Sequence, residues 1–287
     1  MSESKRANAE QIAYWNEISG PKWVALADRI NDQIEPLGLE AMDRAGFAQG
    51  ERVLDVGCGC GQTSLEIARR VGSEGRVLGL DISGPMLDDA RARAERAGAA
   101  TLEFAQSDAQ THAFDDASFD GLFSRFGVMF FEDPPAAFAN LRRALAPGGR
   151  LTFICWQSVA ENPWMLLPVQ AAAQHVELPA PAGPEAPGPF AFADALRVRS
   201  ILDAAGFGEV AVNAFAGDLS VGRGLALDEI IDFLKQMGPA GAALRESSED
   251  VQAAVTRSMH EVLAPHYRDG AVVLPFGSWI VEARNPG

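Results

Sequence analysis

The apolar residues near the N-terminus recur at helical spacing. Ile12 and Trp15 would share one face of a first helix, and Asn8 with Gln11 would form its N-terminal capping pair. Residues 19–21 read SGP and are expected to break this helix, because proline suits the first turn of a helix better than its interior. The pattern therefore predicts that a second helix begins at the proline.

Two further helices are predicted before residue 47. The second would turn four apolar side chains inward, namely Val24, Ala27, Ile30 and Ile34. The third would cover residues 39–44 and end near Gly46. We therefore expect residues 1–46 to form a helical lid that is separate from the rest of the chain.

From residue 51 the pattern alternates between short apolar runs and helical spacing. The predicted strands are 52–56, 76–80, 102–105, 119–124 and 150–155. The predicted helices between them are 65–71, 85–97 and 136–145. Such alternation predicts an α/β fold, a doubly wound parallel sheet with right-handed crossovers and helices on both faces. Residues 47–156 would form this core.

After residue 156 the alternation stops. Residues 178–189 hold five prolines among alanines and glycines, and predict a loop within an insertion. Helices are expected at 194–205, 227–238 and 247–263, and strands at 210–215 and 277–283. Residues 157–287 would thus complete the sheet and carry an inserted cap over the substrate.

Composition narrows the possible partners. The 287 residues are 47% hydrophobic and 22% charged, with a formal net charge of -15. A nucleic-acid-binding surface must be basic to displace phosphate counterions, so we expect no nucleic-acid partner. Residues 1–10 are polar and no apolar run is long enough to span a membrane, which predicts a cytoplasmic protein without a membrane partner. The three cysteines, Cys58, Cys60 and Cys155, predict neither a disulfide framework nor a metal site.

The sharpest chemical feature is a glycine-rich loop after the first strand of the core. Residues 53–61 read VLDVGCGCG, an apolar strand followed by Gly57, Gly59 and Gly61 and then by a helix. Glycine is needed where the backbone is left-handed or touches a ligand, and the helix start presents unpaired N–H groups to an anion. The loop alone is also compatible with a structural turn that binds nothing.

Two acidic positions follow neighbouring strands. Asp81 ends the second strand, where a carboxylate can accept both ribose hydroxyls of a nucleoside, although it could also cap the next helix. Asp108 follows the third strand and could accept an adenine amino group, with the Ala109 N–H meeting a ring nitrogen; its alternative role is to form a turn. A nicotinamide dinucleotide loop would need a third glycine at position 62, which is Gln62. Together these residues favour S-adenosylmethionine over a dinucleotide.

These motifs as a set resemble the class I S-adenosylmethionine-dependent methyltransferases, in a branch similar to the enzymes that methylate ubiquinone and menaquinone precursors. The resemblance rests on residues 53–61, LDIS at 80–83, SDA at 107–109, FDGLFS at 119–124 and LAPGGRL at 145–151. It extends over roughly residues 14–156 and fades beyond them. It implies a Rossmann-like sheet of seven strands with an antiparallel last strand, and N-terminal helices that close over the cofactor.

The resemblance also implies a set of donor-binding residues. They are Asp55, Gly57, Cys58, Gly59, Gly61, Asp81, Ile82, Met86, Asp108, Ala109, Ser124, Tyr14 and Trp23. The two aromatic rings would attract the positive charge of the sulfonium, or would only hold the helices to the core.

The sequence defines the residues that bind the methyl acceptor less well than those that bind the donor. The candidates to bind the acceptor are Arg125, Phe126, Phe130 and Trp156, with Met129, Trp164 and Phe190 as further apolar lining. The alternative role of the apolar residues is to pack in the core. Arg125 could bind an anionic group of the acceptor or pair with a surface carboxylate. The sequence does not identify a general base; His112, just past Asp108, is a candidate that could reach the site or could lie exposed on a loop. We expect methyl transfer to a small, fairly hydrophobic acceptor; the alternatives are a protein that binds the donor without transferring methyl, and a nicotinamide-dependent oxidoreductase.

Overall fold

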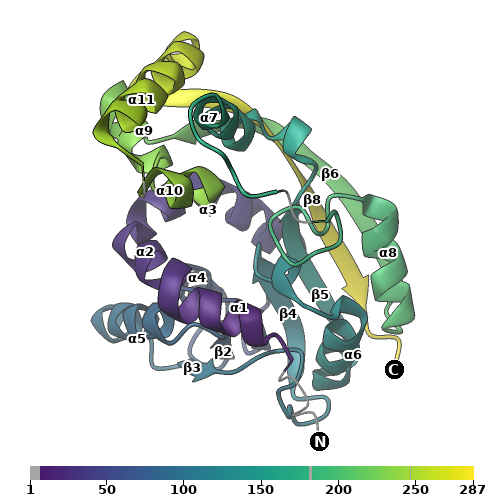
Figure 1. The fold of residues 1–287 in the computed structure, drawn as a ribbon. Coiled ribbons are helices and arrows are strands. Elements are labelled where there is room, and N and C mark those ends of the chain that lie inside the picture. The colour runs from purple at the N-terminus through teal and green to yellow at the C-terminus, as the bar shows by residue number, and fades with distance from the viewer. Residues whose placement is uncertain (1–6, 181–182, 246) are drawn as a thin grey trace, which may run out of the picture. The chain divides into compact units, whose positions relative to one another are not determined.

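The computed structural model describes residues 7–180, 183–245 and 247–287 (Figure 1). They form two compact units. The first runs to Cys155 and adds Glu185–Ala214 and Trp279–Gly287, and the second comprises Trp156–Pro184 and Phe215–Ser278. The division into a lid, a core and a remainder at residues 46 and 156 stays a prediction. Residues 1–6 of the predicted lid and 181–182 of the proline-rich loop lie outside the described residues.

The strands form one sheet in the order β3-β2-β1-β4-β5-β8-β6, with β7 paired to β8. Their bounds are β1 Arg52–Val56, β2 Arg76–Asp81, β3 Leu102–Gln106, β4 Phe119–Arg125, β5 Leu145–Trp156, β6 Gly208–Val221, β7 Tyr267–Arg268 and β8 Ala271–Arg284. The pairs from β3 through β5 are parallel. Backbone N–H groups of Gly148 and Gln157, at opposite ends of β5, donate to Asn285 and Gly277 respectively, so β8 runs antiparallel to β5. The predicted mostly parallel sheet with an antiparallel last strand is confirmed.

Helices lie on both faces of the sheet in the first unit. On one face Phe123 of β4 meets Phe47, which follows α3, with ring centroids 6.1 Å apart. Phe153 of β5 is in register with Ser124 and therefore faces the other way, where it meets Phe138 of α6 at 5.5 Å. These aromatic contacts help to hold the strand ends in place, and Phe123, Phe138 and Phe153 are fully buried.

The helices in the described part of the chain confirm most of the predicted ones. Their bounds are α1 Ala9–Ala13, α2 Ser19–Ala25, α3 Ala27–Ala45, α4 Gln62–Val71, α5 Gly84–Ala97, α6 Pro134–Ala144, α7 Pro163–Ala173, α8 Ala195–Ala204, α9 Leu227–Leu234, α10 Gly238–Arg245 and α11 Glu249–Leu263. The sequence did not predict α7, which packs against α11 in the second unit. It also merged α9 with the beginning of α10. None of the described helices is both long enough and apolar enough to cross a membrane.

The N-terminal helices differ from the prediction in three ways. The side chain of Asn8 makes no capping bond, because its backbone is left-handed with φ 53°. The SGP run does not interrupt the helical path: a π-helix, Tyr14–Ile18, leads directly into α2, and the break falls at Leu26. The predicted second helix is divided at Leu26, and its part from Ala27 on joins the predicted third helix in α3. Helix α3 continues through Pro36 because its buried positions keep helical spacing on both sides. It ends at Gly46, as predicted.

Candidate functional site

The glycine loop, residues 57–61, leaves the carboxyl end of β1 and leads into α4. Gly57, Gly59 and Gly61 have φ angles of 67°, 56° and 80°, in the left-handed region that strains other residues. A Cβ atom on Gly57 would lie 2.8 Å from Cα of Gly127, in the loop after β4. Glycine is therefore required here for the approach of two backbones as well as for conformation.

Asp55, next to the end of β1, is fully buried. Its Oδ2 accepts hydrogen bonds of 2.6 Å from the hydroxyls of Thr63 and Ser64, in the first turn of α4. Its Oδ1 has no hydrogen-bond partner among the described residues. Burial outweighs the two hydroxyl bonds and raises the pKa of Asp55 to about 6. At the base of the glycine loop, Asp55 thus keeps a buried carboxylate oxygen that can still accept a hydrogen bond.

Asp81 ends β2 and connects the loops that follow β1 and β2. Its carboxylate accepts 2.8 Å hydrogen bonds from the backbone N–H groups of Gly59 and Ser83. Burial raises its pKa, and these bonds partly oppose the rise. Each oxygen retains a lone pair that a ligand hydroxyl could use. Met86 of α5 lies against the same loop, since a Cβ atom on Gly59 would be 2.8 Å from its Cε.

Asp108, after β3, is buried and already has protein partners. Its Oδ2 accepts a 2.8 Å bond from the side-chain amide of Asn8, and its Oδ1 accepts from the Gln110 N–H at 2.9 Å. The carbonyl of Ala109 accepts from Asn140 Nδ2 at 2.9 Å. Asn8, expected to cap the first helix, instead ties the N-terminal segment to the strand end.

The N-terminal cover, as we call Ala9–Ala25, packs against α5 through its second helix (Figure 1). Its middle turn is the π-helix Tyr14–Ile18. The carbonyl of Trp15, in this turn, accepts a 2.8 Å hydrogen bond from the hydroxyl of Ser83, after β2. The wide turn thus presents a backbone acceptor to a strand-end loop.

Asn16 makes the second connection between the cover and that loop. Its Nδ2 donates to the carbonyl of Ile82 at 2.9 Å, and its Oδ1 accepts from the N–H of Gly84 at 2.9 Å. The sequence predicted none of Asn8, Asn16 and Ser83 as site residues, because these bonds join residues 66 or more positions apart.

Aromatic side chains of the cover lie over the glycine loop. Trp15 and Trp23 pack against the buried cluster of Ala27, Cys60 and Met86. The Trp15 ring centroid is 5.7 Å from that of Trp23 and 5.2 Å from that of Phe130. Tyr14, predicted to face the donor, is 41% exposed and contacts the edge of Trp15. The predicted donor contact of Tyr14 stays a prediction.

Ser124 and Phe126 shape the end of β4. The buried hydroxyl of Ser124 donates to the carbonyl of Val56 at 2.7 Å and accepts from the N–H of Gly127 at 3.3 Å. Phe126 is buried and has φ 61°, a strained conformation for an aromatic residue. Ser124 therefore joins β4 to the start of the glycine loop.

Arg125 lies between β4 and α3. Its Nη1 donates to Asn31 Oδ1 at 3.0 Å, and a Cβ atom on Gly38 would be 2.7 Å from its Cδ. Burial lowers its pKa to about 10, although Asp55 and Glu35 favour the charged form. The expected pairing with a surface carboxylate is not seen within the described ranges, because the side chain turns inward.

The remaining acceptor candidates are divided between the two units. His112 Nδ1 lies 2.9 Å from the hydroxyl of Ser107, and its ring contacts Phe114. Trp156 belongs to the second unit and contacts Trp164, with centroids 5.3 Å apart. Phe126, Met129, Phe130 and Phe190 belong to the first. Their roles stay predictions.

Cys58 and Cys60 contribute packing to the loop. Both are buried, and burial raises the pKa of the Cys60 thiol to about 12 and that of Cys58 well above its usual value. Both thiols therefore stay protonated near neutral pH and are poor nucleophiles.

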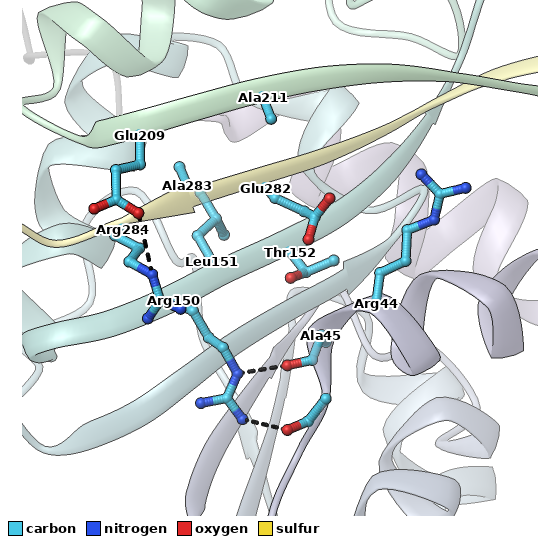
Figure 2. A pocket seen from close by; sticks show the side chains of 11 residues that line it. Arg44, Ala45, Arg150, Leu151, Thr152, Glu209, Ala211, Glu282, Ala283 and Arg284 are labelled. Carbon is cyan, nitrogen blue, oxygen red and sulfur yellow. Dashed lines mark hydrogen bonds and ion pairs between the residues drawn. The ribbon is translucent and has the colours of Figure 1, made fainter.

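A separate cavity of about 470 Å³ lies against β5, β6 and β8 at the end of α3 (Figure 2). Arg150 within it donates to the carbonyls of Ala45 and Gly46, and Arg284 pairs with Glu209. None of the predicted donor residues lines this cavity. The guanidinium groups in these contacts serve to join chain segments.

Comparison with known proteins bears directly on the strand-end site. Residues 53–149 match the family described as methyltransferase domain, and this span contains the glycine loop, Asp81 and Asp108. About a third of the chain is thus similar to a methyltransferase domain. The resemblance to class I S-adenosylmethionine-dependent methyltransferases related to the ubiquinone and menaquinone branch is thereby confirmed.

Relatives that match this part of the chain are named as methyltransferases for different small molecules. Aklanonic acid methyltransferase DauC of Streptomyces sp. (strain C5) is 37% identical over 118 residues, 41% of this chain and 54% of DauC. Ubiquinone/menaquinone biosynthesis C-methyltransferase UbiE of Teredinibacter turnerae is 37% identical over 145 residues, 50% of this chain and 58% of UbiE. The chain thus spans under two thirds of the length of these curated relatives.

The fold of the methyltransferase domain also occurs in solved structures. The structure of phosphoethanolamine N-methyltransferase 2 of Haemonchus contortus in complex with S-adenosyl-L-methionine aligns with a TM-score of 0.54 and 19% identity. The alignment covers 88% of this chain and 53% of that one. At this identity the likeness is one of fold.

Proposed function

We propose that this protein transfers a methyl group from S-adenosylmethionine to a small, fairly hydrophobic acceptor. The observation that carries the proposal is Asp81, whose carboxylate joins the glycine loop to the end of β2 and still has acceptor capacity. A nucleoside ribose offers two hydroxyl donors to such a group. The matching methyltransferase family over residues 53–149 supports methyl transfer as the reaction.

The residues of the site fit the parts of the donor. Asp81 would hold the ribose, and Asp108 with Ala109 would bind the edge of the adenine. The adenine amino group would replace the Asn8 amide at the Asp108 carboxylate or share the carboxylate with it. The free Oδ1 of Asp55 and the left-handed glycines would lie beneath the remainder. Trp15 and Trp23 would offer ring faces to a positive charge.

When bound, S-adenosylmethionine supplies a methyl carbon activated by a positively charged sulfur. The work left to this chain is to bind, align and exclude water, because in-line displacement depends on the geometry of approach. Ser124 and Gly127 fix the β4 end against the glycine loop, and the N-terminal cover would shield the donor from solvent. His112 stays the candidate base for a hydroxyl or carbon acid.

The acceptor class is inferred from charge and from relatives. A net charge of -15 disfavours nucleic acid. DauC and UbiE are named as methyltransferases for aklanonic acid and for ubiquinone and menaquinone biosynthesis. Phe126 and Phe130, near the end of β4, are apolar surfaces that would suit an acceptor of similar character.

The proposal is tested with methyl-labelled S-adenosylmethionine and an extract of the source cells, separated into small-molecule and macromolecular fractions. We expect label on a small metabolite, with release of S-adenosylhomocysteine, and fragmentation would identify the methylated atom. Label on RNA or protein would reject the acceptor class but keep the reaction. Binding of S-adenosylhomocysteine without any transfer would favour a donor-binding protein, and binding of NADH instead would favour an oxidoreductase.

A further inference from the structure

The cavity in Figure 2, about 470 Å³ in volume, is lined by residues of the first unit. Thr152 of β5 is in register with Phe123 of β4, whose ring meets Phe47 after α3, so Thr152 faces the α3 side of the sheet. The lining begins where α3 ends, at Ala45 and Gly46, and continues over strands β5, β8 and β6. The volume lies within the range of about 300–1,000 Å³ that is usual for small-molecule sites.

Thr152 brings an unpaired polar group to this cavity. The residue lines the cavity and is 2% exposed, and its hydroxyl forms no hydrogen bond within the described ranges. Burial of a hydroxyl without a partner is costly, and most such groups in folded proteins are paired with protein or with ordered water. A ligand in the cavity would supply the partner that this hydroxyl lacks.

Glu282 of β8 brings a half-buried carboxylate to the same cavity (Figure 2). Its Oε2 accepts a 3.2 Å hydrogen bond from Asn213 Nδ2, and it forms no ion pair in the part of the chain that the structure describes. A carboxylate oxygen and a hydroxyl oxygen can both accept hydrogen bonds. Glu282 and Thr152 therefore favour a ligand group that carries several N–H donors, such as an ammonium.

Arg150, at the α3 end of the cavity, is engaged by the fold. Its Nε and Nη2 donate to the carbonyls of Ala45 and Gly46, and both of its Nη atoms donate to the carboxylate of Glu51. These bonds hold the guanidinium in place between chain segments. We therefore assign Arg150 no role in binding a ligand.

The other two arginines of the lining, Arg44 and Arg284, form ion pairs with which a ligand can compete. Nε of Arg44 pairs with Glu40 on the preceding turn of α3 at 3.0 Å, and Arg284 pairs with Glu209 at 3.3 Å. The side chains of both pairs are accessible to solvent, and such pairs contribute little to stability. The two guanidinium groups therefore favour an anionic group in the more exposed part of the cavity.

We infer that this cavity is a second binding site, which takes a small zwitterion of the α-amino-acid class. The ammonium of the ligand would donate to the Glu282 carboxylate and the Thr152 hydroxyl, and its carboxylate would accept from Arg44 or Arg284. The arginines would repel a ligand with only a positive charge, and Glu282 would repel one with only a negative charge. The inference goes beyond the proposed function, because none of the predicted donor residues lines the cavity.

The first test uses the native protein and a pool of the standard L-amino acids, with binding detected and titrated by saturation-transfer NMR. The titrations are made with and without excess S-adenosylhomocysteine, which would occupy the strand-end site. We expect one or more amino acids to bind in both conditions. The primary amide and the deaminated acid of each, which lack one charge apiece, should bind at least about tenfold more weakly. No binding, equal binding of the three compounds, or displacement by S-adenosylhomocysteine would overturn the inference.

Variants then locate the site. Glu282→Gln should weaken binding of the amino acid about 10- to 100-fold, and Thr152→Val about 3- to 10-fold. Thr152→Ser keeps the hydroxyl and should bind within about threefold of the native protein. Glu103→Gln, which neutralises an exposed carboxylate on the edge strand β3, should leave the affinity unchanged and is the matched control. Native affinity in both Glu282→Gln and Thr152→Val would overturn the inference.

The outcomes separate the inference from the proposed function. Folded Glu282→Gln and Thr152→Val should bind S-adenosylhomocysteine within about twofold of the native protein, because the two sites share no residue. If the native protein binds an amino acid but not S-adenosylhomocysteine, the proposed function fails and the inference stands. If it binds S-adenosylhomocysteine but no amino acid, only the inference fails. Equal loss of both ligands in the folded variants would place the amino acid at the strand-end site and overturn the inference.

Discussion

The glycine loop and the N-terminal cover meet at the same strand ends but are held by different means. The loop depends on left-handed backbone, on close approach to Gly127 and on two carboxylates, that of Asp55, which is buried, and that of Asp81, which is half-buried. The cover depends on hydrogen bonds that Asn8 and Asn16 donate and that the Trp15 carbonyl accepts. The first set lies at the ends of sheet strands, and we expect that the second set can break while the sheet stays folded. Substitutions in the loop should therefore affect both stability and binding, and those in the cover mainly binding.

The largest expected effect is at Gly57. Gly57→Ala should lower the free energy of unfolding by about 3 kcal/mol, because it adds left-handed strain and forces Cβ against Gly127. Gly50→Ala is the matched control, since Gly50 has φ 84° with open space around its missing Cβ, and should cost about 1 kcal/mol. Urea denaturation measures both. Equal losses would show that the close approach contributes nothing.

Asp55 should make stability depend on pH. Its pKa is 3.8 in the reference state and about 6 in the fold, so the native state holds the proton more tightly. The resulting stabilisation is complete below pH 4 and is lost as pH rises through 6, by about 3 kcal/mol in all. Unfolding curves from pH 4 to 7 for the native protein and Asp55→Asn should diverge over this window. Parallel curves would contradict the raised pKa.

Asp81 separates the ligand role from the structural one. Asp81→Ala should weaken S-adenosylhomocysteine by about 1.5–3 kcal/mol through loss of a charge-assisted ribose contact. Asp81→Asn keeps one carbonyl oxygen for the Gly59 or Ser83 N–H and should lose less stability than the alanine variant. Titration and thermal unfolding of both variants test this. Full affinity in a folded alanine variant would reject the ribose role.

The smallest expected effect on stability is at Asn8. Asn8→Gly permits the same φ of 53° but removes the amide that binds Asp108, and should cost about 1 kcal/mol. Backbone amides of the N-terminal cover should then exchange faster with solvent, while those of β1 and β4 keep their rates. Hydrogen exchange measured by mass spectrometry distinguishes the two regions. Faster exchange in β1 would mean that cover and sheet open together.

The difference between the glycine loop and the N-terminal cover also explains which parts of the structure could be predicted from the sequence. Strands β1 to β4 and helices α4 and α5 were predicted within a few residues, because each carries its own hydrophobic period and stop signal. The bounds of β1, Arg52–Val56, agree with the prediction. The glycines and acidic strand ends could also be identified locally, since the loop and each strand end are short contiguous motifs.

The cover could not be predicted in the same way. Asn8 has a capping residue's chemistry, but its amide finds Asp108, a partner 100 positions away. The proline in SGP predicts a break, yet the preceding π-helix carries the helical path into α2 without one. Arg125 likewise looks like a surface residue in sequence, and only the packing of α3 over β4 turns it inward.

The π-helix Tyr14–Ile18 has a consequence for how this cover can change. A π turn accommodates one more residue than an α turn, so deleting a single residue there would let the segment rewind as an ordinary α-helix. Because the wide turn itself gives up the residue, the segment before it would keep its orientation and Asn8 would still face Asp108. A deletion in the α-helical part of the cover would instead rotate everything before it by about 100° around the helix axis. The π turn is therefore the place at which the cover can shorten by one residue and keep the contact of Asn8.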